Sequence, residues 1–137
     1  MVELPFEYWN KLATQLILTC ALLGGFSIAV TANLLVNQSS GKLYNVILKV
    51  STISSGSFLI AVFAMINVLQ KTTDGYPFEV TPGDLTASRI VGGLTYILGI
   101  VSLLGVIGLA GWTKSKGTGI FTTVVSIISL ILILVFL

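Results

Sequence analysis

The chain has 137 residues, of which 55% are hydrophobic and only 9% are charged. Its mean hydropathy of +1.03 excludes a soluble globular domain, because the surface of such a domain would have too few groups to face water. The formal net charge is +2, with no basic patch or arginine-rich tract, so we expect no nucleic-acid partner.

The charged residues divide the chain into four charge-free blocks. Each block is long enough for a helix to cross a hydrocarbon core of about 30 Å at about 1.5 Å per residue. The sequence therefore predicts an all-α, multi-pass integral membrane protein, with four transmembrane helices in a single domain. The expected helices are 12–36, 50–69, 90–112 and 118–137.

The first expected helix, 12–36, carries two stripes of residues. Ala21, Gly25 and Ala29 are four residues apart and share one face, a spacing of small residues that lets helix backbones approach closely. The second stripe is apolar and ends in a polar amide. It consists of Leu18, Leu22, Phe26, Ala29 and Asn33. An amide at that position needs a polar partner or water, unless the helix faces lipid and Asn33 simply lies at the interface.

The second expected helix, 50–69, begins with a segment rich in hydroxyl groups, 51–57. Serine and threonine hydroxyls bond to other helices or to their own backbone, so we expect a buried, tightly packed face here. The polar segment that follows contains Asp74, Glu79 and Asp84. We interpret these acids as a solvated surface, and a weak site for a divalent ion is the alternative.

The third and fourth expected helices differ in composition. The third, 90–112, contains six glycines, including Gly99, and glycine in a membrane helix favours close packing. The fourth is almost continuously apolar over 130–137. A helix that is apolar all round faces lipid on most sides, which places the fourth helix at the periphery.

The sequence lacks the residues that chemistry requires. No expected helix contains an internal acid, lysine, arginine or histidine, so we expect no enzyme. Histidine is absent altogether and Cys20 is the single cysteine, which argues against zinc, haem or any other cofactor. The basic residues leave the orientation open: one set of connecting segments carries four and the other carries three.

Three segments together resemble the Orai family of calcium channels. Residues 19–30, which include Ala21-Leu22-Leu23-Gly24-Gly25-Phe26, look like the pore-helix motif Ala-Leu-Leu-Ser-Gly-Phe-Ala-Met-Val of that family. Residues 50–66 are similar to its second helix, which begins with serine and threonine and ends in a His-Leu-Phe-Ala-Leu-Met type of stretch. Residues 97–114 look like its segment from Leu-Gly-Ile to Cys-Trp-Ile-Lys. The fourth helix matches only in being apolar.

The resemblance implies a ring of six subunits with the first helix innermost. It puts Asn33 where the family has its selectivity glutamate, and Ala29, Phe26, Leu22 and Leu18 along the pore. An amide in place of the carboxylate favours monovalent cations over calcium. We therefore expect a homo-oligomeric channel without an acidic selectivity ring, in contact with lipid. The alternative is a non-conducting four-helix subunit or scaffold that packs against a larger membrane protein or another copy of itself.

Overall fold

The computed structural model describes residues 6–36, 41–73, 75–79 and 82–136. Over these residues the chain forms four α-helices and one short 3-10 helix. They are α1 (Phe6–Val36), α2 (Lys42–Thr72), η1 (Pro82–Leu85), α3 (Thr86–Trp112) and α4 (Lys116–Phe136). All four α-helices are long and apolar enough to cross a membrane. The predicted all-α architecture with four such helices is confirmed.

The helices extend beyond the expected apolar segments. Both α1 and α2 contain 31 residues and are therefore about 46 Å long, which exceeds a ~30 Å hydrocarbon core. Helix α2 begins at Lys42 rather than near residue 50, because its first two turns already have apolar residues that pack, such as the buried Ile47. Hydropathy finds the apolar part of a helix, whereas helical hydrogen bonding continues into the polar flanks.

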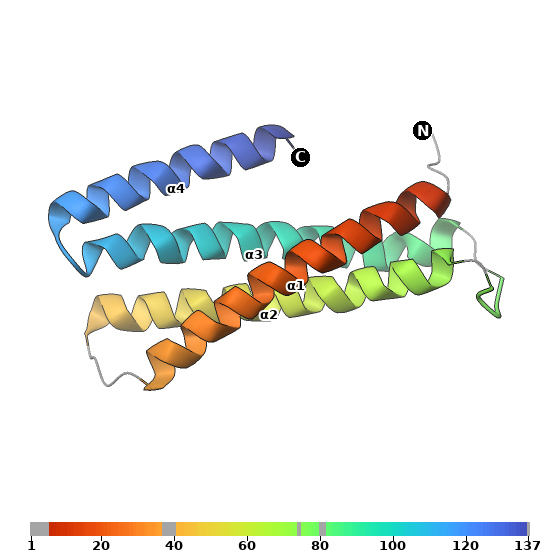
Figure 1. Ribbon diagram of the computed structural model, residues 1–137, viewed down its shortest axis with the longest axis horizontal. Helices are drawn as coiled ribbons and strands as arrows, with labels where there is room; N and C mark the ends of the chain where they lie inside the picture. Colours follow the sequence, from red (N-terminus) through yellow and green to blue (C-terminus); the bar gives the residue numbers. More distant parts are fainter. Residues whose placement is uncertain (1–5, 37–40, 74, 80–81, 137) are drawn as a thin grey trace.

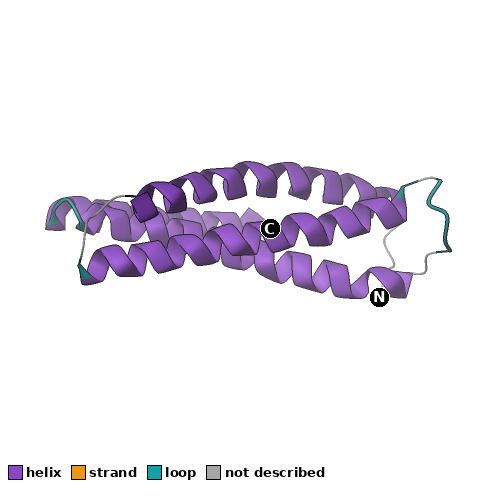
Figure 2. Ribbon diagram, turned by 90° about the horizontal axis from the view of Figure 1, so that it is seen from below, coloured by secondary structure: helices purple, strands orange, loops and turns teal. Residues whose placement is uncertain are grey.

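The helices run back and forth along the long axis of the molecule, and the non-helical segments gather at its two ends (Figures 1 and 2). Successive helices pack on one another, α1 on α2, α2 on α3 and α3 on α4. Helix α1 crosses the α2–α3 pair obliquely, while α4 lies along α3 (Figure 1). The end of α1, the start of α2 and the turn between α3 and α4 lie at the same end.

The core centres on Phe58 of α2, which is fully buried. It forms a cluster with Cys20, Ala61 and Ile100, so α1, α2 and α3 all contribute. Two glycines make room for it. A Cβ atom added at Gly24 would lie 3.1 Å from Phe58 Cβ, and one at Gly99 would lie 2.9 Å from Phe58 Cε1. The close approach of α1 and α3 to α2 therefore depends on glycine at these two positions.

The large apolar side chains lie mostly on the outside. Among the described residues of α4, only Gly119 and Ser126 are buried. Most of its other residues are apolar and exposed, including Phe121, which is 69% exposed, and Val135, which is 70% exposed. A surface of this kind is stable next to lipid and unfavourable in water.

Candidate functional site

Hydroxyl groups join α1 to α2, and α2 to α3. Ser27 Oγ lies 3.1 Å from Ser54 Oγ, and Ser54 donates to the carbonyl of Gly99 on α3 at 3.2 Å. One turn further along α1, Thr31 Oγ1 lies 2.6 Å from Ser51 Oγ and 3.1 Å from Ser55 Oγ. The hydroxyl-rich segment predicted to form a buried packing face does so, and its partners are on α1 and α3.

Each hydroxyl proton in this network has an acceptor. Ser54 donates its one hydroxyl proton to the Gly99 carbonyl. In the bond between Ser27 and Ser54, Ser27 is therefore the donor and Ser54 the acceptor. Thr31 donates to the carbonyl of Ser27 at 2.8 Å, so the bond between Ser51 and Thr31 is donated by Ser51. The network is therefore satisfied internally, and it contains no titratable group. Its role is to hold α1 in one rotational setting.

The start of α1 is held by a second set of polar contacts. The amide of Asn10 donates to the carbonyl of Leu69 at 3.3 Å and to Thr72 Oγ1 at 3.1 Å, both near the end of α2. The Arg89 guanidinium of α3 lies 4.6 Å from the centre of the Trp9 ring, a cation–π contact. With contacts at its start and in its second half, α1 has a fixed face toward the chain and a fixed face away from it.

The face of α1 that points away carries the predicted pore stripe. Leu18, Leu22 and Phe26 are 63%, 68% and 58% exposed, and Ala29 and Asn33 are exposed as well. The residues of the stripe are thus brought together on one surface that no other helix of the chain covers.

The three residues predicted to pack closely do not behave alike. Gly99 lies against the Phe58 ring, as described above. Ala21 and Gly25 are exposed, and a Cβ atom added at Gly25 would meet nothing within 4 Å. Inside the chain the close approach is made by the neighbouring Gly24. For Ala21 and Gly25, close packing stays a prediction about contacts with another chain.

Helices α3 and α4 enclose a groove that sequence reasoning missed. It has a volume of about 240 Å³ and is lined mainly by apolar residues, together with Thr123 and Ser126. The hydroxyl of Ser126 is buried and has no hydrogen-bond partner in the described part of the chain. The groove needs residues from two helices, Gly108 on α3 opposite Ser126 on α4, so no pattern within either helix indicates it.

Two of the three acids of the polar connection lie in the described part of the chain. Asp74 lies outside the described residues, and Glu79 and Asp84 are exposed. No group of three or more histidine, cysteine or acidic side chains that could hold a metal ion occurs among the described residues. The exposed face of α1, which brings the predicted stripe together, is the candidate functional surface.

These features define a class of protein, one with four long apolar helices and an uncovered, mostly apolar face on the first of them. Searches against protein-family models, curated proteins and solved structures found no match for this chain. The likeness to the Orai family therefore rests on the sequence segments alone and stays a prediction.

Proposed function

We propose that this chain is a multi-pass membrane protein and one subunit of a homo-oligomeric channel, with the exposed face of α1 lining the pore. The observation that carries the proposal is the stripe from Leu18 to Asn33, which is uncovered in the subunit. Its 15 residue steps correspond to about 22 Å along the helix axis, which is most of the thickness of a hydrocarbon core.

The composition of the stripe favours a symmetry axis over lipid. Small residues (Ala21, Gly25, Ala29) lie beside large ones (Leu22, Phe26), so identical copies of α1 can approach closely around an axis. Helix α4 has no glycine or alanine over 127–136, and its one small residue there, Ser129, is half-buried, so its exposed part suits lipid instead. This contrast supports α1 as the innermost helix of the ring and α4 as the outermost.

The side chains on the proposed pore surface suggest how it works. Rings of Leu22 and Phe26 form a narrow apolar section that closes by excluding water. Asn33 places a ring of uncharged amides toward one mouth, which suits monovalent cations better than divalent ones. Six subunits are expected from the Orai-like segments.

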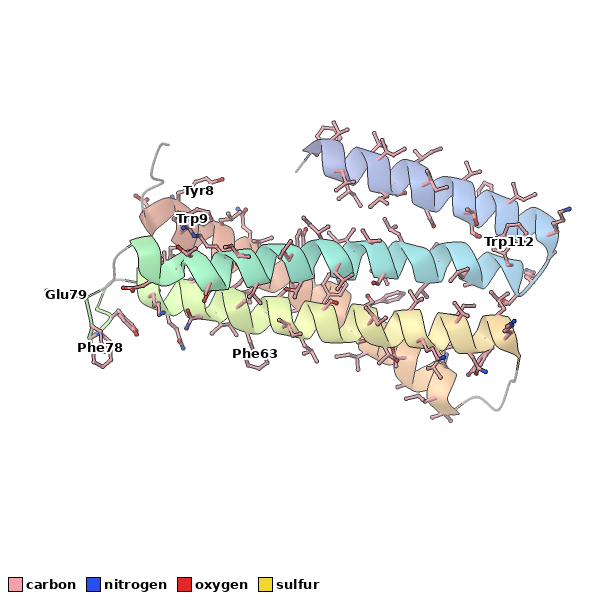
Figure 3. The ribbon with its side chains drawn as sticks, turned by 180° about the vertical axis from the view of Figure 1, so that it is seen from behind. Tyr8, Trp9, Phe63, Phe78, Glu79 and Trp112 are labelled. Carbon is pink, nitrogen blue, oxygen red and sulfur yellow. The ribbon has the colours of Figure 1, made fainter. Side chains whose placement is uncertain are left out.

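Ion flux in liposomes tests the proposal. The purified protein is reconstituted, and the leak of monovalent cations is compared between the unmodified chain and Phe26→Ser. A hydroxyl in the apolar section lets water enter, so we expect the variant to leak continuously, by about tenfold or more over the unmodified protein. Phe63→Ser is the matched control. Phe63 is a similarly exposed phenylalanine (69%) that points outward from α2 (Figure 3), where the same change opens no pore.

Two results would contradict the channel. The first is an unchanged flux in a stably folded and assembled Phe26→Ser protein. The second is an equal increase in Phe26→Ser and Phe63→Ser, which indicates a general loss of packing. Particle symmetry in detergent or nanodiscs gives an independent measurement, because a ring requires closed rotational symmetry.

The second candidate function is a non-conducting subunit that packs against a larger membrane protein. The observation that favours it is the groove between α3 and α4, in which the buried Ser126 hydroxyl has no hydrogen-bond partner among the described residues. A side chain of another membrane protein that enters the groove and parts its lining would accept that hydrogen bond. Absence of conductance, with loss of partner binding in a Ser126→Leu variant that fills the groove, would favour this function over the channel.

A further inference from the structure

The charges of the molecule are sorted between its two ends. One end, called here the lysine end, is formed by the segments 41–49 and 113–117, whose charged residues are Lys42, Lys49, Lys114 and Lys116. These segments contain four lysines and no acid. The other end, called here the mixed end, has Lys11, Lys71 and Arg89, and all acids of the described residues lie there. The two ends have similar numbers of basic residues, four and three, and differ in that the described acids lie at the mixed end only.

The cations of the mixed end already have partners within the chain. Lys11 Nζ lies 3.3 Å from a carboxylate oxygen of Glu7. Lys71 donates to the backbone carbonyl of Asp84 at 3.4 Å, and Arg89 lies over the Trp9 ring. Each of the three cations of this end therefore has a partner within the chain.

The lysines of the other end have no such partners. All four are exposed, and no side chain among them has an ion pair or a hydrogen bond with the residues that the structure describes. They also differ in depth: Lys49 is two turns inside α2, about 10 Å from Lys42 along the helix axis. Trp112, an aromatic residue of the kind found among lipid headgroups, closes α3 beside Lys114.

The depth of these lysines identifies the partner. Lys49 is followed by a charge-free stretch of α2 that reaches Lys71, 22 residues or about 33 Å further on. That length matches the hydrocarbon core, so Lys49 and Lys71 each mark one edge of it. We propose that the lysine end binds anionic phospholipid headgroups, which are negatively charged at the depth where these ammonium groups lie. The proposal rests on the membrane placement above and is independent of the pore.

The two tryptophans of the chain provide a reporter for each end. Trp9 lies at the mixed end and Trp112 at the lysine end (Figure 3). In Trp9→Phe all tryptophan emission comes from Trp112, and in Trp112→Phe all of it comes from Trp9, when excitation is chosen to avoid the tyrosines. Each full-length variant is reconstituted in vesicles of phosphatidylcholine and phosphatidylglycerol, with bromine, a quencher, on the acyl chains of one lipid or the other at equal mole fraction.

We expect enrichment of the anionic lipid at the lysine end only. In the Trp9→Phe protein, brominated phosphatidylglycerol should quench at least about twofold more than brominated phosphatidylcholine. In the Trp112→Phe protein the two lipids should quench equally. The excess at Trp112 should disappear when Lys42, Lys49, Lys114 and Lys116 are all changed to Gln. It should also fall at about 1 M salt, where the screening length is about 3 Å, so the test does not depend on that variant folding.

The outcomes separate this proposal from the membrane placement itself. Equal quenching of Trp112 by the two lipids, at low salt, overturns anionic-lipid binding but leaves the membrane placement intact. An excess that is the same at both tryptophans also overturns it, because the lipid preference then does not follow the lysines. No quenching of either tryptophan by either lipid overturns the membrane placement, and with it this proposal.

Discussion

The contact region between α1, α2 and α3 and the exposed face of α1 differ in composition. The contact region combines buried apolar residues, such as Phe58, with small and hydroxylated ones: Gly24, Ser27, Ser54 and Gly99. The exposed face has small residues too, but it also carries large apolar side chains that no helix covers. In a water-soluble protein, large apolar side chains are mostly buried.

The difference follows from the solvent that each region is adapted to. Lipid tails are as apolar as leucine, so burying large apolar residues between helices gains little in a membrane. Close backbone approach and hydrogen bonds between helices supply the association energy there, and both require small or hydroxylated residues. A hydroxyl that faces lipid can bond only to its own helix and adds nothing to helix association, whereas a leucine facing lipid costs nothing.

The largest expected effect comes from a pair of adjacent glycines that belong to the two regions. Gly24 faces Phe58, whereas Gly25 faces away from the chain. Gly24→Leu should destabilise the subunit by about 1–3 kcal/mol, because the added side chain has to push α1 away from α2. Gly25→Leu, which makes the same gain in helix propensity, should leave the stability of the subunit unchanged or slightly raised. The free energy of unfolding in mixed detergent micelles measures both.

The Gly25→Leu variant also sharpens the proposal of a ring. If copies of α1 approach through Ala21, Gly25 and Ala29, the variant should fold but fail to assemble, which the particle mass in detergent reports. Equal destabilisation by the two leucines would contradict the contrast between the regions. A fully assembled Gly25→Leu protein would contradict close packing at this stripe.

These two glycines also illustrate how far the sequence allows prediction. The four helices follow from the lack of charge between Lys11 and Lys42 and in the later blocks, because hydropathy is a local property of the chain. Which face of α1 meets α2 is not local. Either Gly24 or Gly25 could allow a close approach of α2. The regular spacing of Ala21, Gly25 and Ala29 favours Gly25, which is the one that faces away from the chain.

Which face of α1 meets α2 is decided by the partners that its residues find on other helices. Gly24 meets Phe58, and Ser27 and Thr31 find hydroxyl partners on α2, residues that lie 20 or more positions further along the sequence. The sequence predicts that α2 has a hydroxylated packing face but does not name the helix that covers it. The stripe of the candidate site could be predicted because it is a pattern within one helix. The groove at Ser126 could not, because it needs two.

A smaller effect is expected from the hydroxyl network. Ser54→Ala removes both the acceptor of Ser27 and the donor to the Gly99 carbonyl, and should cost about 1 kcal/mol of unfolding free energy. Thr52→Ala is the matched control, because Thr52 is exposed and bonds only to the Leu48 carbonyl of its own helix, at 2.8 Å. Its effect should stay within about 0.5 kcal/mol. If both changes cost the same, the network does not hold α1 on α2.

The smallest effect on stability, and the most informative one on function, is expected at Asn33. This residue is exposed, so Asn33→Glu should leave the subunit fold unchanged within about 0.5 kcal/mol. Its consequence in the proposed pore is large. A calcium ion is bound by oxygens that also carry negative charge, and charges a few ångströms apart in a poorly screened pore attract strongly. The amide of Asn33 offers an oxygen without the charge.

The lysine end strengthens this expectation, because Asn33 lies in the last turn of α1, toward the same end as Lys42 and Lys114. Positive charge near that mouth disfavours divalent cations further. Asn33→Glu should therefore raise the Ca²⁺/Na⁺ permeability ratio and introduce block of the sodium current by calcium. The control is Asn45→Glu, which makes the same change at an exposed amide of α2 toward that end. A permeability ratio that shifts equally in both variants reflects surface charge alone. If the Asn33→Glu channel conducts and its Ca²⁺/Na⁺ permeability ratio equals that of the unmodified protein, Asn33 does not face the pore.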